Sequence, residues 1–341
     1  MLKKNRRVSG KIGLEEHFAT NDTVDGGLYF VLDPEKKKIL GGKLLDILTM
    51  RLDLMDQYEM QMMILSLNSP AIQARWEKGA AIELARRAND TVAETIARLP
   101  NRYRSFGALP MQDPDEAARE LERCVKSLGF VGALVNGFSQ IDREDNIVYL
   151  DDARYTNFWA KVEELDVPFY LHPRSPIPQH RHMYQGHPYL RAAAWGFAVE
   201  TGTHVLRLMC SGLFDKFPKL QIIIGHLGEF LPAHIYRTDC SLNRQARGFI
   251  DLKDDDPLPW KRSLVDYFNE NFHVTTSGNF RTQVLLNALL EIGSDRVLFS
   301  TDYPFEDVGI ACDWFDDCPI SENDLRKIGR TNAMRLFNLK L

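Results

Sequence analysis

The sequence contains few cysteines and no long apolar run, and both absences narrow the class of protein. Its five cysteines are scattered and odd in number, and the nearest pair, Cys312 and Cys318, is too widely spaced for a C-x-x-C redox motif. Exported domains that are stabilised by disulfides usually contain an even number of cysteines, in a higher proportion of the sequence. No apolar stretch approaches the roughly 18 residues of a membrane-spanning helix. We therefore expect reduced thiols, no membrane partner and a cytoplasmic location.

The chain also lacks an excess of positive charge. Its 42 Lys and Arg residues stand against 47 Asp and Glu residues, for a formal net charge of −5. Proteins whose main partner is a nucleic acid usually have a basic surplus, so no such partner is expected. The basic cluster at residues 3–7 is not followed by an apolar segment, which favours a solvated tail over a targeting signal.

Three common catalytic signatures are missing from the sequence. It contains no G-x-S-x-G elbow, no phosphate-binding P-loop and no G-x-G-x-x-G turn. A serine hydrolase, a nucleotide-phosphate enzyme and a dinucleotide-dependent oxidoreductase would each be expected to contain one of them. The sequence therefore gives no support to these three classes.

Short apolar runs alternate with helical patterns along the whole chain. The runs are continuous rather than alternating, which is typical of parallel strands covered by helices on their outer face. A strand followed by a helix, repeated eight times, predicts a (β/α)8 TIM-type barrel, an α/β fold, as a single domain over residues 1–341. The eight runs are residues 11–17, 62–67, 105–109, 130–135, 167–172, 222–226, 272–276 and 296–301.

Helix signals lie between these runs. Asp113 precedes a proline and predicts the cap of a helix that continues to Gly129, and Ser321 with Asp324 predicts the start of the last helix. Residues 21–44 appear polar and irregular, and we interpret them as an insertion: a lid over the barrel mouth or a partner-binding loop. The last helix is expected over residues 321–336, and the other expected helices are residues 80–99, 155–165 and 190–214.

Polar residues stand at the ends of four runs, where the active sites of barrel enzymes form. The first run ends in Glu15-Glu16-His17, the fifth at His172, the sixth at His226 and the eighth at Asp302. Glu15 and His17 are two apart and should share a strand face. Each residue alone could be a hydrogen-bonded histidine or a loop cap. Together these carboxylates and imidazoles suit a divalent cation such as Zn²⁺ or Mn²⁺.

Further candidates have open alternatives. Glu229 could orient His226 or simply begin a helix, Arg237 could bind an anion or lie exposed, and Asn136 could donate to a substrate or cap its loop. The histidine cluster at 180, 182 and 187 lies among prolines and is interpreted as a polar loop. Aromatic residues that could wall a pocket or fill the core are Phe138, Trp195, Phe197, Tyr303 and Phe305.

With these residues in view, the sequence resembles the amidohydrolase-related decarboxylases, and among them those that act on 2,6-dihydroxybenzoate. The resemblance extends from about Gly10 to the end of the chain, with its motifs in the same order and spacing. Departures occur at residues 191–195 and in the segment 21–44. The matching stretches are residues 10–19, 64–74, 129–140, 165–178, 222–232, 266–283, 295–306 and 328–339.

The resemblance implies roles for individual residues. It implies one divalent metal ion (Zn²⁺ or Mn²⁺, with Mg²⁺ as a third option) and no organic cofactor. Asn136 and Arg237 would contact the substrate. Asp302 would also donate a proton to the ring, which requires a raised pKa. The metal ligands would be Glu15, His17, His172 and Asp302, and the catalytic residues Asp302, His226 and Glu229.

The implied reaction is the reversible, non-oxidative decarboxylation of an ortho-hydroxybenzoic acid. The first candidate is 2,6-dihydroxybenzoate, which would yield resorcinol and CO2, while 2,3-dihydroxybenzoate and salicylate stay open. The resemblance also implies a cytoplasmic homotetramer, a dimer of dimers. Two alternatives remain: a metal-dependent hydrolase of a lactone or amide, and a non-catalytic barrel that serves as a scaffold.

Overall fold

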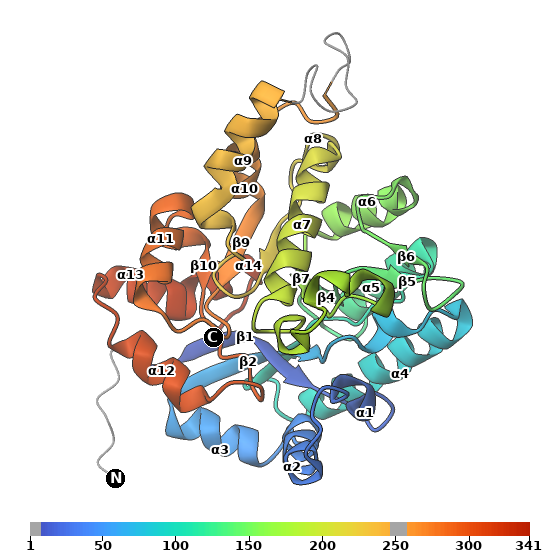
Figure 1. The fold of residues 1–341 in the computed structure, drawn as a ribbon. Helices are drawn as coiled ribbons and strands as arrows, with labels where there is room; N and C mark the ends of the chain where they lie inside the picture. Colours follow the sequence, from blue (N-terminus) through green and yellow to red (C-terminus); the bar gives the residue numbers. More distant parts are fainter. Residues whose placement is uncertain (1–7, 246–257) are drawn as a thin grey trace.

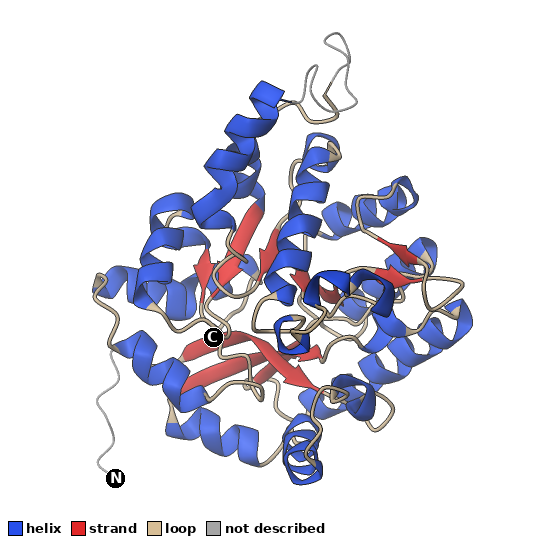
Figure 2. Cartoon of the chain, in the orientation of Figure 1, coloured by secondary structure: helices blue, strands red, loops and turns tan. Residues whose placement is uncertain are grey.

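The computed structural model of the protein describes residues 8–245 and 258–341, so the basic cluster at residues 3–7 lies outside the described part. Eight parallel strands occupy the centre and helices surround them (Figures 1 and 2), as predicted. The strands are β1 (Lys11–Phe18), β2 (Met60–Leu67), β3 (Tyr103–Ser105), β4 (Ala133–Asn136), β7 (Phe169–His172), β8 (Ile222–Ile224), β9 (Phe272–Thr275) and β10 (Val297–Leu298).

The eight strands are arranged as two ladders joined into a ring. One ladder runs β1-β2-β3 and the other β10-β9-β8-β7-β4. A parallel bridge between Gly107 and Ala133 joins β3 to β4. At the other junction the Glu15 amide donates to Ser300 Oγ at 2.6 Å and the His17 amide to the Tyr303 carbonyl at 2.7 Å. The first and last strands are therefore neighbours, although 280 or so residues separate them.

Helices follow most of the strands, and two short strands, β5 (Ser139–Gln140) and β6 (Ile147–Val148), form an antiparallel hairpin outside the ring. The longer helices are α2 (Pro34–Leu45), α3 (Met50–Gln57), α4 (Lys78–Ala97), α5 (Pro114–Lys126), α6 (Thr156–Leu165), α7 (Gly196–Cys210), α9 (Leu231–Gln245), α10 (Leu264–Asn271), α11 (Thr282–Ile292) and α12 (Val308–Asp316). The shorter helices are α1 (Val24–Gly27), α8 (Leu213–Lys216), α13 (Glu322–Arg326), the π-helical η7 (Lys327–Thr331) and α14 (Asn332–Leu336).

Both predicted helix caps are confirmed. The Asp113 carboxylate accepts from two backbone amides of the first turn of α5, and Ser321 accepts from the Asp324 amide. The expectation that residues 21–44 are irregular is wrong, because α1 and most of α2 lie there. Asp33 caps α2 and Pro34 follows it, which is the same signal as at Asp113. The helix expected at 190–214 begins only at Gly196 and is broken at Gly212, where φ is +77°.

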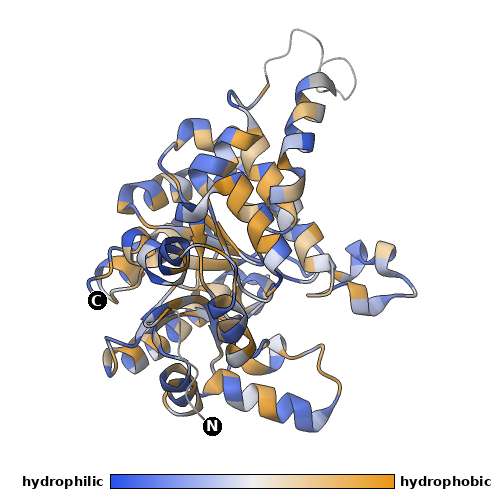
Figure 3. Cartoon of the chain, turned by 90° about the vertical axis from the view of Figure 1, so that its left-hand side faces the viewer, coloured by the Kyte–Doolittle hydropathy of each residue, from blue (hydrophilic) through white to orange (hydrophobic). Residues whose placement is uncertain are grey.

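The core has two parts. Inside the ring, side chains from most strands meet one another, among them Ile12, Met62, Tyr170 and Ile223. A larger apolar layer lies between the outer face of the strands and the helices. In Figure 3 the hydrophobic colour is concentrated on the strands and on the inward helix faces, while hydrophilic residues lie outside. A filled interior leaves the strand ends as the place for polar side chains.

An irregularity in β1 re-aims its last residues. Gly13 pairs with Met63 and Glu16 with Leu65, so two residues of β1, Leu14 and Glu15, oppose the single residue Ile64 of β2. Such a bulge adds one residue and changes which side chains face inward. Leu14 belongs to the interior cluster and Glu15 is fully buried beside it. The bulge thus brings the Glu15 carboxylate to the same side as the apolar interior, at the end of the strand.

Acid should destabilise the fold partly through His204 of α7. Its Nε2 accepts the Leu150 amide at 3.0 Å, and burial, with a smaller effect of Arg207, lowers the pKa of His204 to about 3. Below about pH 6.5 the unfolded chain therefore binds a proton that the folded chain does not. For such a group the free energy of unfolding decreases by about 1.4 kcal/mol for each unit by which the pH is lowered. Urea unfolding at pH 7, 6 and 5 should give a shallower pH slope for His204→Gln than for wild type.

The control is His234→Gln, because His234 is exposed on α9. This control should keep the wild-type slope. Equal slopes for all three proteins would contradict the prediction.

Within the described part of the chain, none of the helices is both long and apolar enough to cross a bilayer. None of the five cysteines, all of which lie among the described residues, forms a disulfide.

Candidate metal centre and active site

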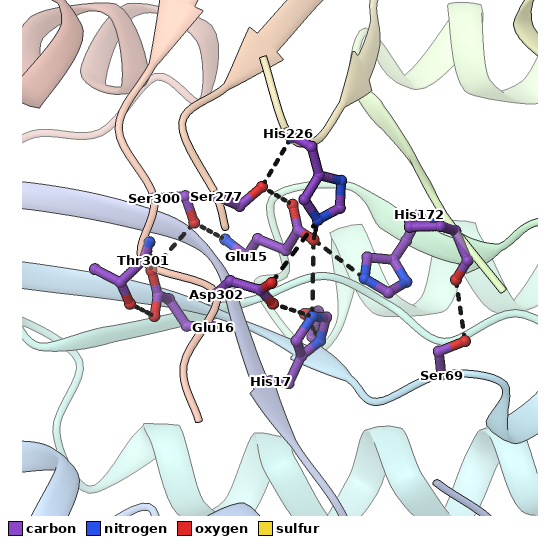
Figure 4. Close-up of polar contacts among 12 residues, drawn as sticks. Glu15, Glu16, His17, Ser69, His172, His226, Ser277, Ser300, Thr301 and Asp302 are labelled. Atoms are coloured by element: carbon purple, nitrogen blue, oxygen red, sulfur yellow. Dashed lines mark hydrogen bonds and ion pairs between the residues drawn. The ribbon is translucent and has the colours of Figure 1, made fainter. Parts of the chain in front are cut away.

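Five side chains from strand ends meet at one point, as Figure 4 shows. Glu15 Oε1 lies 3.1 Å from His172 Nε2, 3.6 Å from His226 Nε2 and 3.9 Å from His17 Nε2. Asp302 Oδ1 lies 3.3 Å from His17 Nε2, and its Oδ2 lies 3.8 Å from His226 Nε2. The sequence predicted that these residues would converge, and the structure brings them together.

The centre of this cluster has the features of a cation site. Glu15, His17 and His172 offer ligand atoms within 4.8 Å of one another, as do Glu15, His226 and Asp302. Glu15 Oε1 and His17 Nε2 are buried, yet neither has a hydrogen-bond partner among the described residues. Leaving buried polar atoms unsatisfied is costly. Carboxylate oxygen and imidazole nitrogen are the donors that Zn²⁺ and Mn²⁺ accept, so the residues present fit a divalent cation.

Each of the three histidines is held from behind through its other ring nitrogen. His17 Nδ1 lies 3.0 Å from Ser66 Oγ, and His172 Nδ1 lies 2.8 Å from Asn136 Oδ1. His226 Nδ1 lies 2.6 Å from Glu229 Oε1, as the pairing of these two residues in the sequence suggested. In all three rings Nε2 therefore faces the cluster, which is the arrangement of oriented metal or proton-transfer imidazoles.

The second oxygen of Glu15 is fixed by hydroxyl groups. Ser277 Oγ donates to Glu15 Oε2 at 2.5 Å, and the Tyr170 hydroxyl donates to the same oxygen. Gly225 makes this position possible, because a Cβ at residue 225 would lie 2.7 Å from Glu15 Oε2. Glu15 is thus held by one oxygen and presents the other to the centre.

Gly225→Ala should therefore weaken metal binding. The added methyl group would displace the Glu15 carboxylate, and we expect a loss of about 10–100-fold in metal affinity, as for other changes that misorient a ligand. Titration of metal-stripped protein with Mn²⁺ would measure it. Gly79→Ala is the matched control, because a Cβ there meets nothing within 4 Å. Unchanged affinity in Gly225→Ala would contradict this account of Glu15.

The charges in the cluster compensate one another. Burial alone would raise the pKa of Glu15, but His226 and contacts with His17 and His172 outweigh it and hold that pKa well below its usual value. Burial alone would lower the pKa of His17, but Asp302 and Glu15 raise it to about 9. A bound cation would replace the positive charge that these protons supply, so metal binding should release protons.

Asp302 differs from the expectation of a raised pKa. Burial does raise the pKa of Asp302, but its contacts with His17 and His226 outweigh burial and hold it below the usual value. For His226 the balance is opposite: burial lowers the pKa, and Glu229 and Glu15 raise it well above the usual value. These two shifts favour a protonated His226 imidazole beside an ionised Asp302 carboxylate.

The backbone is strained at the same residues. His226, Leu227, Glu229 and Phe230 have φ values between +50° and +69°, and Asp302 has φ of +64°. Non-glycine residues rarely adopt this left-handed conformation, and it is concentrated at functional sites. The turn after β8 therefore adopts an unfavourable conformation that aims His226 at the cluster and lets Glu229 reach back to it.

Glu16 points away from the cluster, as the period of a strand predicts. Its carboxylate accepts from the Thr301 amide at 2.9 Å and from the Thr301 hydroxyl at 2.5 Å. Burial raises the pKa of Glu16 to about 7 despite these bonds. Glu16 thus joins β1 to the segment after β10 and holds the two strands that supply Glu15 and Asp302.

A cavity of about 680 Å³ opens beside the cluster. His172, His226 and Asp302 lie on its wall, and so do residues of the segment 21–44. Its size is in the ordinary range for a small-molecule site. Its apolar wall includes Tyr29, Phe30, Leu40, Phe197 and Phe305, and its polar wall includes Gln140, Glu144, Arg174 and Arg181.

Two predicted substrate residues are not on this wall. Among the described residues that line the cavity, neither Asn136 nor Arg237 is found. Asn136 is buried behind His172. Arg237 is on α9 as expected, but its side chain is exposed and borders a separate shallow hollow with Tyr236 and Cys240. Whether either residue meets a substrate stays a prediction.

The structure places the candidate aromatic residues and the histidine cluster in different environments. Phe197 and Phe305 line the cavity, whereas Phe138 and Tyr303 are buried in the fold. Trp195 is half exposed and pairs with the Phe230 ring. The histidine cluster at 180, 182 and 187 is exposed in the loop after β7, as interpreted.

Three further residues near the cluster and the cavity carry little signal in the sequence. Ser66 was hidden inside an apolar run, although its strand position two residues beyond Ile64 places it on the inner face. Arg174 stands two residues after His172 in the sequence and lines the same cavity, so its spacing from His172 is its only signal. Tyr29 belongs to a segment remote in sequence, and only its fold shows that it reaches the cavity.

A barrel of eight strands with a cluster of carboxylates and imidazoles at their carboxyl ends is the architecture of a metal-dependent barrel enzyme. The sequence model of the amidohydrolase family matches residues 50–339. Gamma-resorcylate decarboxylase of Polaromonas sp. (strain JS666 / ATCC BAA-500) is 55% identical over 332 residues, which cover 97% of this chain and 99% of that protein.

Solved structures agree with this comparison. A 2,6-dihydroxybenzoate decarboxylase in complex with 2,6-dihydroxybenzoate is 55% identical, with a TM-score of 0.92 over 97% of this chain and 100% of its own. A dihydroxybenzoic acid decarboxylase from Polaromonas sp. JS666, with bound manganese and the inhibitor 2-nitroresorcinol, is 54% identical, with a TM-score of 0.92 over 97% of each chain. The chain belongs to the amidohydrolase family and, within it, to the metal-dependent decarboxylases, which are carboxy-lyases.

Proposed function

We propose that this protein catalyses the non-oxidative decarboxylation of 2,6-dihydroxybenzoate to resorcinol and CO2. The main support is the buried pair Glu15 Oε1 and His17 Nε2, which lack hydrogen-bond partners in the described chain beside an aromatic-walled cavity. The similarity to decarboxylases of this substrate over nearly the whole chain adds to it. A ring with a carboxylate and ortho hydroxyl groups suits a cation site set in apolar walls.

The proposed metal ligands are Glu15, His17, His172 and Asp302, with Mn²⁺ or Zn²⁺ as the cation and Mg²⁺ as a third option. A divalent ion there would supply Lewis-acid attraction for the substrate carboxylate and its neighbouring phenolic oxygen. Phe305 lies against His17, with 5.5 Å between the ring centroids, so an apolar surface adjoins the site. The aromatic walls would exclude water from the bound ring.

Proton delivery is the chemical task of the side chains. Asp302 is the proposed donor to ring carbon C1, and His226 Nε2, 3.8 Å from Asp302 Oδ2, is the proposed source of its proton. Glu229 contacts Nδ1 of that imidazole and raises its pKa, which favours the charged form. After the proton adds to C1, the bond between C1 and the carboxylate carbon breaks. Its electron pair returns to the ring and CO2 leaves, so no organic cofactor is required.

The reverse reaction uses the same steps. A phenol bound in this cavity with CO2 would lose its ring proton to Asp302 as the new carbon–carbon bond forms. We therefore propose that the protein also carboxylates resorcinol at high bicarbonate concentration.

The segment 21–44 is the proposed lid, within a single catalytic domain spanning residues 1–341. Tyr29 and Phe30 line the cavity, and the Tyr29 hydroxyl donates to Ser175 Oγ at 2.5 Å, which joins this segment to the loop after β7. That bond joins two parts of the cavity wall, because Ser175 also lines the cavity. Arg237, which the resemblance assigns to the substrate, stays a proposed contact, and its side chain is exposed on α9 outside the cavity lining of the described chain.

A homotetramer, built as a dimer of dimers, and a cytoplasmic location complete the proposal. Both rest on the resemblance of the sequence. Light scattering coupled to size-exclusion chromatography would measure the assembly, and a mass other than four chains would contradict it.

A substrate panel tests the proposed reaction. Protein loaded with Mn²⁺ is incubated with 2,6-dihydroxybenzoate, 2,3-dihydroxybenzoate or salicylate, and CO2 and the phenol are quantified. We expect the highest kcat/KM for 2,6-dihydroxybenzoate. Hydrolysis of a lactone or amide without CO2 release from any acid would favour the hydrolase alternative. Absence of both a stoichiometric metal and turnover would favour the scaffold alternative.

A further inference from the structure

We propose that Asn136 is a positioning residue for the metal-binding imidazole of His172, rather than a contact for the substrate, and that Gln73 and Arg174 hold Asn136 in place. This inference rests on the proposed role of His172 as a metal ligand. It assigns a task to three buried side chains, of which Asn136 and Gln73 lie behind His172 and Arg174 also reaches the cavity wall.

The contact between Asn136 and His172 sets which ring nitrogen is available. The two residues are register partners at the ends of β4 and β7, and Asn136 Oδ1 lies 2.8 Å from His172 Nδ1. An amide oxygen only accepts hydrogen bonds, so the proton of the neutral ring is on Nδ1. The lone pair is then on Nε2, which lies 3.1 Å from Glu15 Oε1 in the cluster. Asn136 therefore fixes both the tautomer and the direction of the ring.

Gln73 holds the backbone of Asn136. The Asn136 amide donates to Gln73 Oε1 at 3.2 Å, and Gln73 Nε2 donates to the Leu109 carbonyl at 2.9 Å. Gln73 is buried and uses both ends of its side-chain amide. The loops after β2, β3 and β4 are thus joined through this one side chain.

Arg174 holds the residues around this pair. Its Nη1 donates to the carbonyls of Gln73 and Phe138, at 3.0 and 2.9 Å, and its guanidinium lies over the Phe138 ring at 4.2 Å. Gly137 leaves room for the arginine stem, because a Cβ at residue 137 would lie 2.8 Å from Arg174 Cγ. Asn136 is therefore restrained on both sides.

Burial argues against a substrate contact for Asn136. Its exposed fraction is 2%, and it is not among the described residues that line the cavity. The ring of His172 lines that cavity and lies in front of it. A side chain behind a metal ligand acts on metal affinity first and on substrate affinity only through the metal.

The test compares metal affinity with KM. Mn²⁺ is titrated calorimetrically into metal-stripped wild type, Asn136→Leu and Asn136→Asp, and KM for 2,6-dihydroxybenzoate is measured at saturating Mn²⁺. Asn136→Leu loses the acceptor and should bind Mn²⁺ about 10–100-fold more weakly, with an unchanged KM. Asn136→Asp keeps an acceptor oxygen and should bind Mn²⁺ at least as tightly as wild type. Asn101→Leu, at an exposed position, is the control and should match wild type.

Gln73→Met provides a second measurement if the leucine variant does not fold. It removes the acceptor for the Asn136 amide, and it should weaken Mn²⁺ binding less than Asn136→Leu does while KM stays unchanged. Wild-type affinity in this variant would overturn the role of Gln73.

The failure of this inference is distinct from that of the proposed function. Wild-type Mn²⁺ affinity together with a raised KM in Asn136→Leu would identify a substrate contact and overturn the inference alone. Wild-type protein that binds no divalent ion would overturn the proposed function and the inference together.

Discussion

Replacing Asp302 by asparagine should reduce kcat by about 10²–10⁴-fold, the usual effect of losing a general acid, while the protein still binds its metal. An amide cannot pass a proton to the ring, whereas Glu15, His17 and His172 stay in place around the cation. The fold should tolerate the change, because Asp302 has φ of +64° and asparagine is one of the few residues that adopt this region readily.

The measurement pairs turnover with metal content. Initial rates with 2,6-dihydroxybenzoate give kcat, and elemental analysis gives Mn²⁺ per chain for the same sample. Glu291→Gln, a carboxylate-to-amide change on α11 at a residue that is not among those lining the cavity, is the control and should keep both values. An Asp302→Asn variant with near-normal turnover would refute the role of Asp302 as proton donor.

Replacing His172 by alanine should remove both the metal and the activity. His172 Nε2 is the imidazole atom nearest to Glu15 Oε1 in the cluster, at 3.1 Å. Its loss removes one nitrogen ligand from the proposed metal site beside the buried Glu15 carboxylate. We expect metal affinity to fall by more than about 100-fold, beyond the effect of losing an orienting partner. Equilibrium dialysis followed by elemental analysis would measure the metal that remains bound.

His234→Ala serves as the control for this variant, because His234 is exposed on α9. It should retain full metal content and wild-type turnover. Thermal unfolding of both variants without metal would separate a lost ligand from a damaged fold. Full stoichiometric metal in His172→Ala would contradict the assignment of the centre.

The fold could be predicted well because its signals are local. Eight apolar runs marked the strands within a few residues, and Asp113 and Ser321 marked helix starts through bonds to the next turn. The error at residues 21–44 was avoidable, since Asp33-Pro34 is the same local signal. The start of α7 was harder, because its sequence before Gly196 continues the helical period although the backbone there forms a separate turn.

The candidate site was predictable only in part. Strand ends identified Glu15, His17, His172, His226 and Asp302, because the carboxyl ends of parallel strands share one edge of a barrel. The lowered pKa of Asp302 was not predictable, since it depends on the distances to His17 and His226. Nor was the bulge in β1 predictable, although it decides that Glu15 faces inward.

The sequence by itself determined the order of strands and helices and the kinds of ligand that end the strands, because both depend on neighbours along the chain. Only the tertiary structure decided which atoms of those ligands are free to bind a cation, which side chains stand behind them and which segments line the cavity. These properties depend on contacts between residues as far apart as Glu15 and Ser300, and such contacts exist only once the barrel has closed.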